Sequence, residues 1–169
     1  MKKDLYAYTF LAYSLVTVIF VAIYISLMGF KPLTSYIKND FFSLVNLFIF
    51  LSGVVIHEII HYLCFRLANV EKDKVKIGFS LKSLMPYVHC KAIVSRNVYI
   101  FSAISPFVLL ALIPLCASLL LSSTPLFVFS LFMAKGAAGD LASILLVLTR
   151  SNKQSNILDS KEFGFEVRS

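Results

Sequence analysis

The stretch from Phe41 to Ala68 reads FFSLVNLFIFLSGVVIHEIIHYLCFRLA, and it decides the fold. An α-helix needs about 20 mostly apolar residues to cross a bilayer, so this stretch is long enough to span a membrane. Well inside it stand three ionisable side chains, His57, Glu58 and His61. Such side chains are costly in lipid and therefore mark a functional site. The stretch predicts a transmembrane helix that carries a site within it.

Three further stretches meet the same length criterion: Leu5–Phe30, Val98–Leu121 and Pro125–Leu148. Apolar residues make up 59% of the chain and charged residues 15%, against about 45–50% and about 25% in average soluble domains. This composition excludes a soluble globular domain and an intrinsically disordered chain. We therefore expect an all-α integral membrane bundle of about four transmembrane helices, forming a single domain over residues 1–150.

The basic residues are distributed unevenly over the segments between the spans. Thirteen of the sixteen Lys and Arg residues lie before the first span, in the loop 66–96 or from residue 150 onward, and two lie in the loop 31–40. The positive-inside rule places the larger group in the cytosol. We expect a multi-pass protein of the cell membrane with both termini cytosolic and a flexible cytosolic tail over residues 151–169. The bilayer is its expected partner, and no basic pattern indicates nucleic acid.

The loop between the second and third spans shows a different pattern from the spans themselves. Apolar and polar residues alternate over residues 75–81, and they alternate again over residues 88–94 after Pro86. Alternation with a period of two is typical of strands that have one apolar face. The pattern predicts a short β-hairpin-like structure beside the cytosolic face of the membrane.

His57, Glu58 and His61 form an H-E-x-x-H motif. Residues four apart share one face of a helix, so both imidazoles can bind one metal ion. Glu58 lies about 100° around the helix, where its carboxylate can reach a water on that metal. Zinc lowers the pKa of such a water to about 7, and Glu58 is the candidate general base that takes its proton. The alternative is a hydrogen-bonded network that packs helices without a metal.

Catalytic zinc usually has three protein ligands, and Asp140 in the fourth span is the candidate for the third. His57 and His61 lie 11 and 7 residues before Ala68, and Asp140 lies 10 residues before Arg150. The second and fourth spans run in the same direction, so these side chains are expected at a similar depth in the membrane. The small residues Gly136–Gly139 just before Asp140 allow either a close helix approach or a local break in the helix.

Together these features resemble the site-2-protease-like intramembrane zinc metalloproteases. The resemblance rests on His57-Glu58-x-x-His61, on the Gly-Asp pair at 139–140 and on the basic hairpin-like loop between them, and it covers roughly residues 41–150. More narrowly, the chain is similar to a family of short bacterial membrane proteins described as zincin peptidases of unknown function. The resemblance implies that His57, His61 and Asp140 hold a single zinc ion and that Glu58 is the base.

Three other side chains are weaker candidates for the site. Lys135 precedes Asp140 by five residues and could approach the site if the helix unwinds at a glycine, although snorkelling toward the interface is the simpler role. His89 in the loop could line the site or be an ordinary loop histidine. Cys64 lies seven residues after His57 on the same helix face and could be a fourth, closing ligand, or simply a small buried side chain.

Two classes of function fit this set of residues. The first is zinc-dependent hydrolysis of a peptide bond in or near the membrane, with a membrane protein or a membrane-anchored peptide as the substrate. The second is a membrane protein that binds zinc without catalysis, as a sensor, a carrier or a partner of a complex. A pore or proton pathway is a weaker interpretation, because ionisable residues do not recur along the spans.

Overall fold

The computed structural model describes residues 2–81, 85–152, 154–159 and 165–168. Its helices are α1 (Lys2–Met28), α2 (Lys31–Asn39), α3 (Leu44–Leu67), the short η1 (Lys72–Lys74), α4 (Arg96–Phe107), the π-helical η2 (Val108–Leu112), α5 (Ile113–Leu120), α6 (Thr124–Gly136) and α7 (Ala138–Arg150). Its strands are β1 (Val75–Ser80), β2 (Met85–Cys90), β3 (Ile93–Ser95), β4 (Asn156–Asp159) and β5 (Phe165–Arg168). The chain is therefore mostly helical, with a small β-hairpin between α3 and α4, as the sequence predicts.

Within the described residues, three helical segments are long and apolar enough to cross a membrane: Asp4–Met28, Leu44–Leu67 and Arg96–Leu120. The last of these joins α4, η2 and α5 into one span, and the π-helical turns lie between Pro106 and Pro114. The fourth predicted span is a pair of helices, α6 and α7, that meet at an angle of 44°. The break at Ala137 leaves Asp140 in the first turn of α7.

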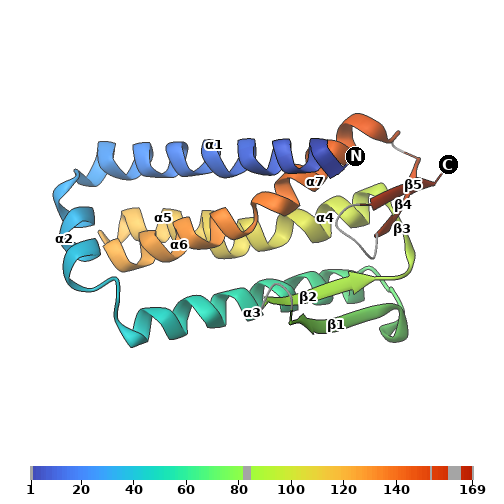
Figure 1. Cartoon of the computed structure of the whole chain (residues 1–169), viewed down its shortest axis with the longest axis horizontal. Coiled ribbons are helices and arrows are strands. Elements are labelled where there is room, and N and C mark those ends of the chain that lie inside the picture. The colour runs from blue at the N-terminus through green and yellow to red at the C-terminus, as the bar shows by residue number, and fades with distance from the viewer. Residues whose placement is uncertain (1, 82–84, 153, 160–164, 169) are drawn as a thin grey trace.

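The spans are arranged in layers, with α1 and α3 on the two outer sides and α4, α5, α6 and α7 between them (Figure 1). Buried aromatic side chains fill the centre of the bundle, where Tyr24 stacks on Phe127 at a centroid distance of 4.0 Å. Ser43 precedes helix α3, and its hydroxyl caps the helix by accepting a hydrogen bond from the Asn46 amide. Many large apolar side chains on α1 and α3 stay exposed, which fits a lipid-facing surface.

The five strands of the described residues lie in the half of the molecule that holds both termini, which we call the sheet end (Figure 1). Strands β3, β4 and β5 lie at the end of the bundle, and β1 and β2 lie alongside the C-terminal half of α3. Strands β1 and β2 form an antiparallel hairpin that pairs Val75 with Cys90 and Ser80 with Met85. The hairpin is shorter than the predicted 75–94, because residues 93–95 leave β2 and pair instead with β4 as strand β3. The α2 helix lies at the opposite end of the bundle.

The segment after α7, which the sequence predicts to be a flexible tail, contains two strands among its described residues. Its described residues form β4 and β5, which extend β3 into a three-stranded antiparallel sheet. The anchor is Ile157, which is completely buried and packs with Leu5, Leu146 and Val147. In the sequence only Ile157 and Leu158 are apolar between residues 151 and 162, which is too weak a signal to predict this strand. Residues 153, 160–164 and 169 of the predicted tail lie outside the described residues.

Candidate metal centre

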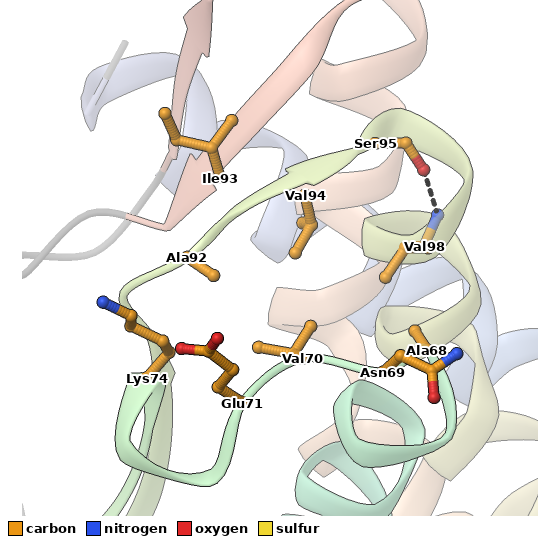
Figure 2. A pocket seen from close by; sticks show the side chains of 10 residues that line it. All are labelled: Ala68, Asn69, Val70, Glu71, Lys74, Ala92, Ile93, Val94, Ser95 and Val98. Atoms are coloured by element: carbon orange, nitrogen blue, oxygen red, sulfur yellow. Dashed lines mark hydrogen bonds between the residues drawn. The ribbon is translucent and has the colours of Figure 1, made fainter.

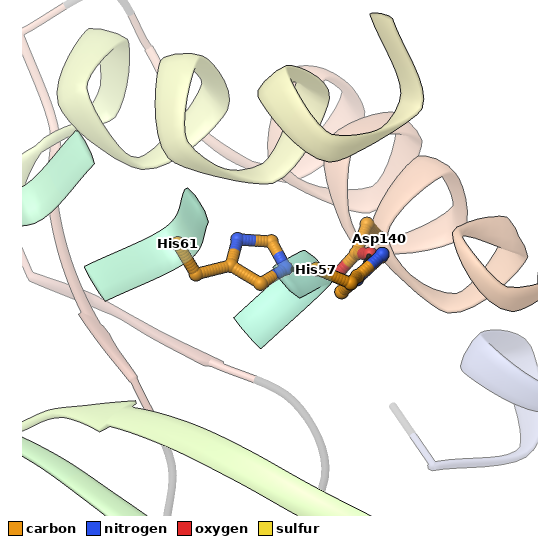
Figure 3. A group of neighbouring side chains, drawn as sticks. All are labelled: His57, His61 and Asp140. Carbon is orange, nitrogen blue, oxygen red and sulfur yellow. Dashed lines mark hydrogen bonds and ion pairs between the residues drawn. The ribbon is translucent and has the colours of Figure 1, made fainter. Parts of the chain in front are cut away.

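His57 and His61 lie one turn apart on α3 and point toward the same place (Figure 3). Their Nε2 atoms are 3.2 Å apart, and their ring centroids are separated by 4.9 Å. The two side chains are only 12% and 13% exposed, so both rings are held between helices. The helical spacing of the H-E-x-x-H motif therefore brings the two imidazole nitrogens together as the sequence predicts.

Asp140 reaches the same place from α7 (Figure 3). Its Oδ2 atom lies 3.1 Å from Nε2 of His57, and its Oδ1 atom lies 3.5 Å from Nε2 of His61. The first turn of a helix is a favourable position for a carboxylate, because the helix dipole is positive there. The break at Ala137 creates this helix start. Of the two outcomes expected for Gly136 and Gly139, a close helix approach or a local break, the break is the one that occurs. A Cβ atom on Gly136 or Gly139 would meet no atom within 4 Å, so no close helix packing occurs there.

The three side chains fit a zinc ion in their number, chemistry and spacing. One ligand atom from each residue can be chosen so that all lie within 4.8 Å of one another. Two ligands that bind zinc tetrahedrally at about 2.0–2.1 Å are about 3.3 Å apart, close to the distances between these nitrogens and oxygens. Two histidines and one carboxylate are a common ligand set of catalytic zinc sites. These residues therefore form a candidate metal centre.

The orientation of His61 is set by a second contact on α4. Its Nδ1 atom donates a hydrogen bond to the Ser102 carbonyl oxygen at 2.9 Å. This bond places the proton on Nδ1 and leaves Nε2, the atom that faces His57 and Asp140, without one. Hydrogen bonds of this kind fix the tautomer and the ring orientation of metal-binding histidines. The centre is thus built from three spans, α3, α4 and α7.

Glu58 stands apart from the metal-ligand group and faces the hairpin. Its Oε2 atom accepts a hydrogen bond from the Val88 backbone amide of β2 at 2.8 Å. The sequence identifies Glu58 from its motif, but it gives no sign of this partner, because every residue except proline carries a backbone amide. The hairpin that the sequence predicts therefore makes direct contact with the candidate base.

His89, the next residue of β2, pairs with Asp159 of β4. Its Nδ1 atom lies 2.8 Å from Oδ2 of Asp159, and the same oxygen accepts a hydrogen bond from the Cys90 amide at 3.2 Å. Burial raises the pKa of Asp159, and the hydrogen bonds from His89 and Cys90 act in the opposite direction. The sequence does not mark Asp159 as a site residue, because it lies in a polar segment that reads as a flexible tail.

Lys135 and Cys64 do not belong to the metal-ligand group that the described residues form. The Lys135 ammonium lies over the Tyr13 ring of α1, 4.6 Å from its centroid. Cys64 is a buried free thiol, 5% exposed, as expected for a small side chain in a helix interface. A role for Lys135 or His89 at the metal stays a prediction, whereas a fourth ligand from Cys64 has no support in this arrangement.

A cavity of about 440 Å³ lies at the sheet end, between the turn after α3 and the start of α4 (Figure 2). Its lining includes Val70, Glu71 and Lys74 on one side and Ala92, Val94 and Val98 on the other. None of the three candidate metal ligands lines it. The cavity therefore belongs to the junction between the hairpin and α4, and it is separate from the metal centre.

Comparison with known proteins agrees with this arrangement of residues. A family model described as "Putative zincin peptidase" matches residues 49–155, which include His57, Glu58, His61 and Asp140. No curated protein and no solved structure matches the chain. The match covers more than half of the chain and contains the whole candidate metal centre. The chain therefore belongs to the family described as putative zincin peptidases.

Proposed function

We propose that the protein is a zinc-dependent peptidase that cleaves a peptide bond within or next to the membrane. One observation carries the proposal: two imidazole nitrogens from one apolar span and a carboxylate from another converge within 4.8 Å. Ionisable groups inside apolar spans are costly, and their convergence on one point is the arrangement that a metal requires. Membership of the zincin peptidase family supports the same reaction class.

In this proposal His57, His61 and Asp140 hold the zinc ion. When bound there, zinc supplies a Lewis acid that makes a water molecule more acidic and polarises the peptide carbonyl. Glu58 takes a proton from the attacking water and delivers it to the nitrogen of the leaving amine. The Val88 amide binds Oε2 of Glu58, so Oε1 is the oxygen that we assign to proton transfer. Ser102 keeps His61 in the tautomer that binds metal through Nε2.

The substrate in this proposal is a membrane protein or a membrane-anchored peptide. The metal-ligand side chains lie along helices that are apolar enough to span a bilayer, so a peptide bond must reach them at that depth. Following the distribution of basic residues, we assign the sheet end and both termini to the cytosolic side. We infer a site-2-protease-like enzyme, with water and substrate approaching from the cytosol.

The proposal is tested with Glu58→Gln, which removes the base and keeps the size of the side chain. Loss of a general base typically lowers the rate by about 10²–10⁴-fold. Membrane proteomes of cells that make the wild-type protein or Glu58→Gln should differ by the accumulation of an uncut membrane protein, which then serves as the substrate for purified enzyme. Glu71→Gln is the matched control, because Glu71 is exposed and is not part of the ligand group. Wild-type cleavage by Glu58→Gln would overturn the assignment of the base.

The alternative function, zinc binding without hydrolysis, makes a different prediction for the same two strains. A sensor, carrier or complex partner would leave the membrane proteome unchanged by Glu58→Gln. It would also exchange zinc readily with a chelator, whereas a catalytic site should retain zinc through purification. The two measurements together separate the two classes of function.

A further inference from the structure

We propose that Asp159, in strand β4 after the last helix, is a positioning residue for Glu58. The inference rests on the proposed role of Glu58 as the base. Asp159 holds β2 through His89 and the Cys90 amide, and β2 in turn holds the Glu58 carboxylate through the Val88 amide. A segment more than 90 residues beyond the H-E-x-x-H motif would thereby set the orientation of its glutamate.

The backbone amides of β2 point in alternate directions. In an antiparallel pair, successive amides point alternately toward the partner strand and away from it. The Lys91 amide, just after β2, donates to the Lys74 carbonyl just before β1, so odd-numbered amides here face β1. The Val88 and Cys90 amides therefore face away from β1, along the free edge of the hairpin.

The free edge of the hairpin contacts two carboxylates. Val88 donates its amide to Glu58, and Cys90 donates its amide to Asp159. Pro86, the previous residue on the same edge, has no amide hydrogen. The two carboxylates thus bind both outward-facing amides of β2, at adjacent positions about 7 Å apart along the strand.

Asp159 is itself anchored to the helical bundle through β4. Strand β4 pairs with β3, which leads directly into α4, and Ile157 is completely buried against α1 and α7. Asp159 therefore belongs to the side of the molecule that carries Asp140. The hairpin packs on α3, and Asp159 links it across to α4 and α7.

An isolated two-stranded hairpin is only marginally stable, so this link matters for the position of β2. A hydrogen bond to a charged acceptor is stronger than one to a neutral group, and Asp159 accepts two such bonds on one oxygen. Without Asp159, the end of β2 next to Val88 loses its anchor. The Val88 amide then holds Glu58 for a smaller fraction of the time.

The test is amide hydrogen exchange on the full chain in detergent micelles, with no substrate present. In Asp159→Ala we expect the Cys90 amide, and also the Val88 amide, to exchange at least about tenfold faster than in the wild type. The amides of α3 should be unchanged. Asp73→Ala is the matched control, because the Asp73 side chain is 73% exposed. Faster exchange at Cys90 with no change at Val88 would overturn the proposal.

A second variant keeps the proposal testable if Asp159→Ala destabilises the whole protein. Asp159→Asn retains an oxygen acceptor but loses the charge, so exchange at Val88 should be intermediate between the wild type and Asp159→Ala. Exchange at Val88 as slow as in the wild type, or as fast as in Asp159→Ala, would contradict the assigned role of the carboxylate.

A measurement of activity then distinguishes an Asp159 that positions Glu58 from an Asp159 that blocks the substrate. With a cleaved substrate in hand, Asp159→Ala should lower kcat severalfold while KM and zinc content stay the same. A rise in activity would overturn the proposal, because it would mean that Asp159 blocks the hairpin edge against substrate. The exchange measurement needs no catalysis, so failure of the proposed peptidase activity would not be confused with failure of this inference.

Discussion

The metal-ligand group and the free edge of β2 lie next to each other, but the sequence encodes them in different ways. His57, His61 and Asp140 are rare side chains in apolar spans, and their separations along the helices fix their positions. The β2 edge binds Glu58 and Asp159 through backbone amides, which any residue other than proline could supply. The first region depends on which residues are present, and the second depends on how strands pair over long distances.

This difference indicates how the two regions should respond to mutation. Replacing a ligand removes an atom that nothing else in the group can supply. Replacing a side chain on β2 leaves the amides in place, so the edge should tolerate most substitutions other than proline and other than a change of His89, whose ring also contacts Asp159. The effects of mutation should therefore decrease from loss of the metal, through loss of the Glu58 contact, to changes in helix packing.

The largest effect is expected from His57→Ala and Asp140→Ala. Each leaves two of the three ligands, so zinc content should fall from about one ion per chain to a small fraction of that. Elemental analysis of the purified protein measures this directly. His89→Ala is the matched histidine control and should retain zinc, because His89 pairs with Asp159 outside the ligand group. Full zinc content in Asp140→Ala would exclude Asp140 as a ligand.

A smaller effect is expected from Val88→Pro, which removes the amide that Glu58 accepts from. Zinc content should be unchanged, and the rate of substrate cleavage should fall about tenfold, the effect of one hydrogen bond to a charged group. Val88 faces the free edge, so the proline breaks no bond to β1. Ile77→Pro is the control. Ile77 pairs with Val88, and its amide points away from β2, toward the outer edge of β1. Equal losses in both variants would mean that proline disrupts the hairpin in general.

The smallest effect is expected from Gly53→Ala in the scaffold of the metal centre. A Cβ atom there would lie 2.8 Å from Sδ of Met133 and 2.9 Å from the Phe129 ring on α6. Both neighbours are side chains that can shift, so we expect a loss of about 1 kcal/mol in unfolding free energy and a melting temperature lower by a few degrees. Gly136→Ala, with nothing within 4 Å of its Cβ, should cause no such loss. Thermal melting in the same detergent checks both variants.

The helical part of the molecule could be predicted because its signals are local. The apolar stretches predict the spans, and the spacing of His57 and His61 predicts their shared helix face. Asp140 could be predicted as a ligand because the second and fourth spans run in the same direction, which places Asp140 at a depth similar to that of the two histidines. The bend of 44° at Ala137 could be anticipated only as one of two outcomes of the glycines, because small residues serve both close packing and helix breaks.

The sheet end could be predicted only in part. Alternation of apolar residues indicates β1 and β2, but it continues through Val94 and so gives no sign that β3 leaves the hairpin for another sheet. The pairing of β3 with β4 depends on residues about 60 positions apart, and Ile157 is its main apolar anchor. Val88 and Asp159 therefore became candidates only when the strands were in place.

The central claim is that His57, His61 and Asp140 form a zinc site, and X-ray absorption at the zinc edge of the purified wild-type protein tests it most directly. We predict a first shell of four light atoms at about 2.0–2.1 Å, with the scattering pattern of two imidazoles and no sulfur at about 2.3 Å. In Asp140→Ala this spectrum should be lost along with the metal. A sulfur ligand, or a wild-type spectrum without imidazole, would contradict the account.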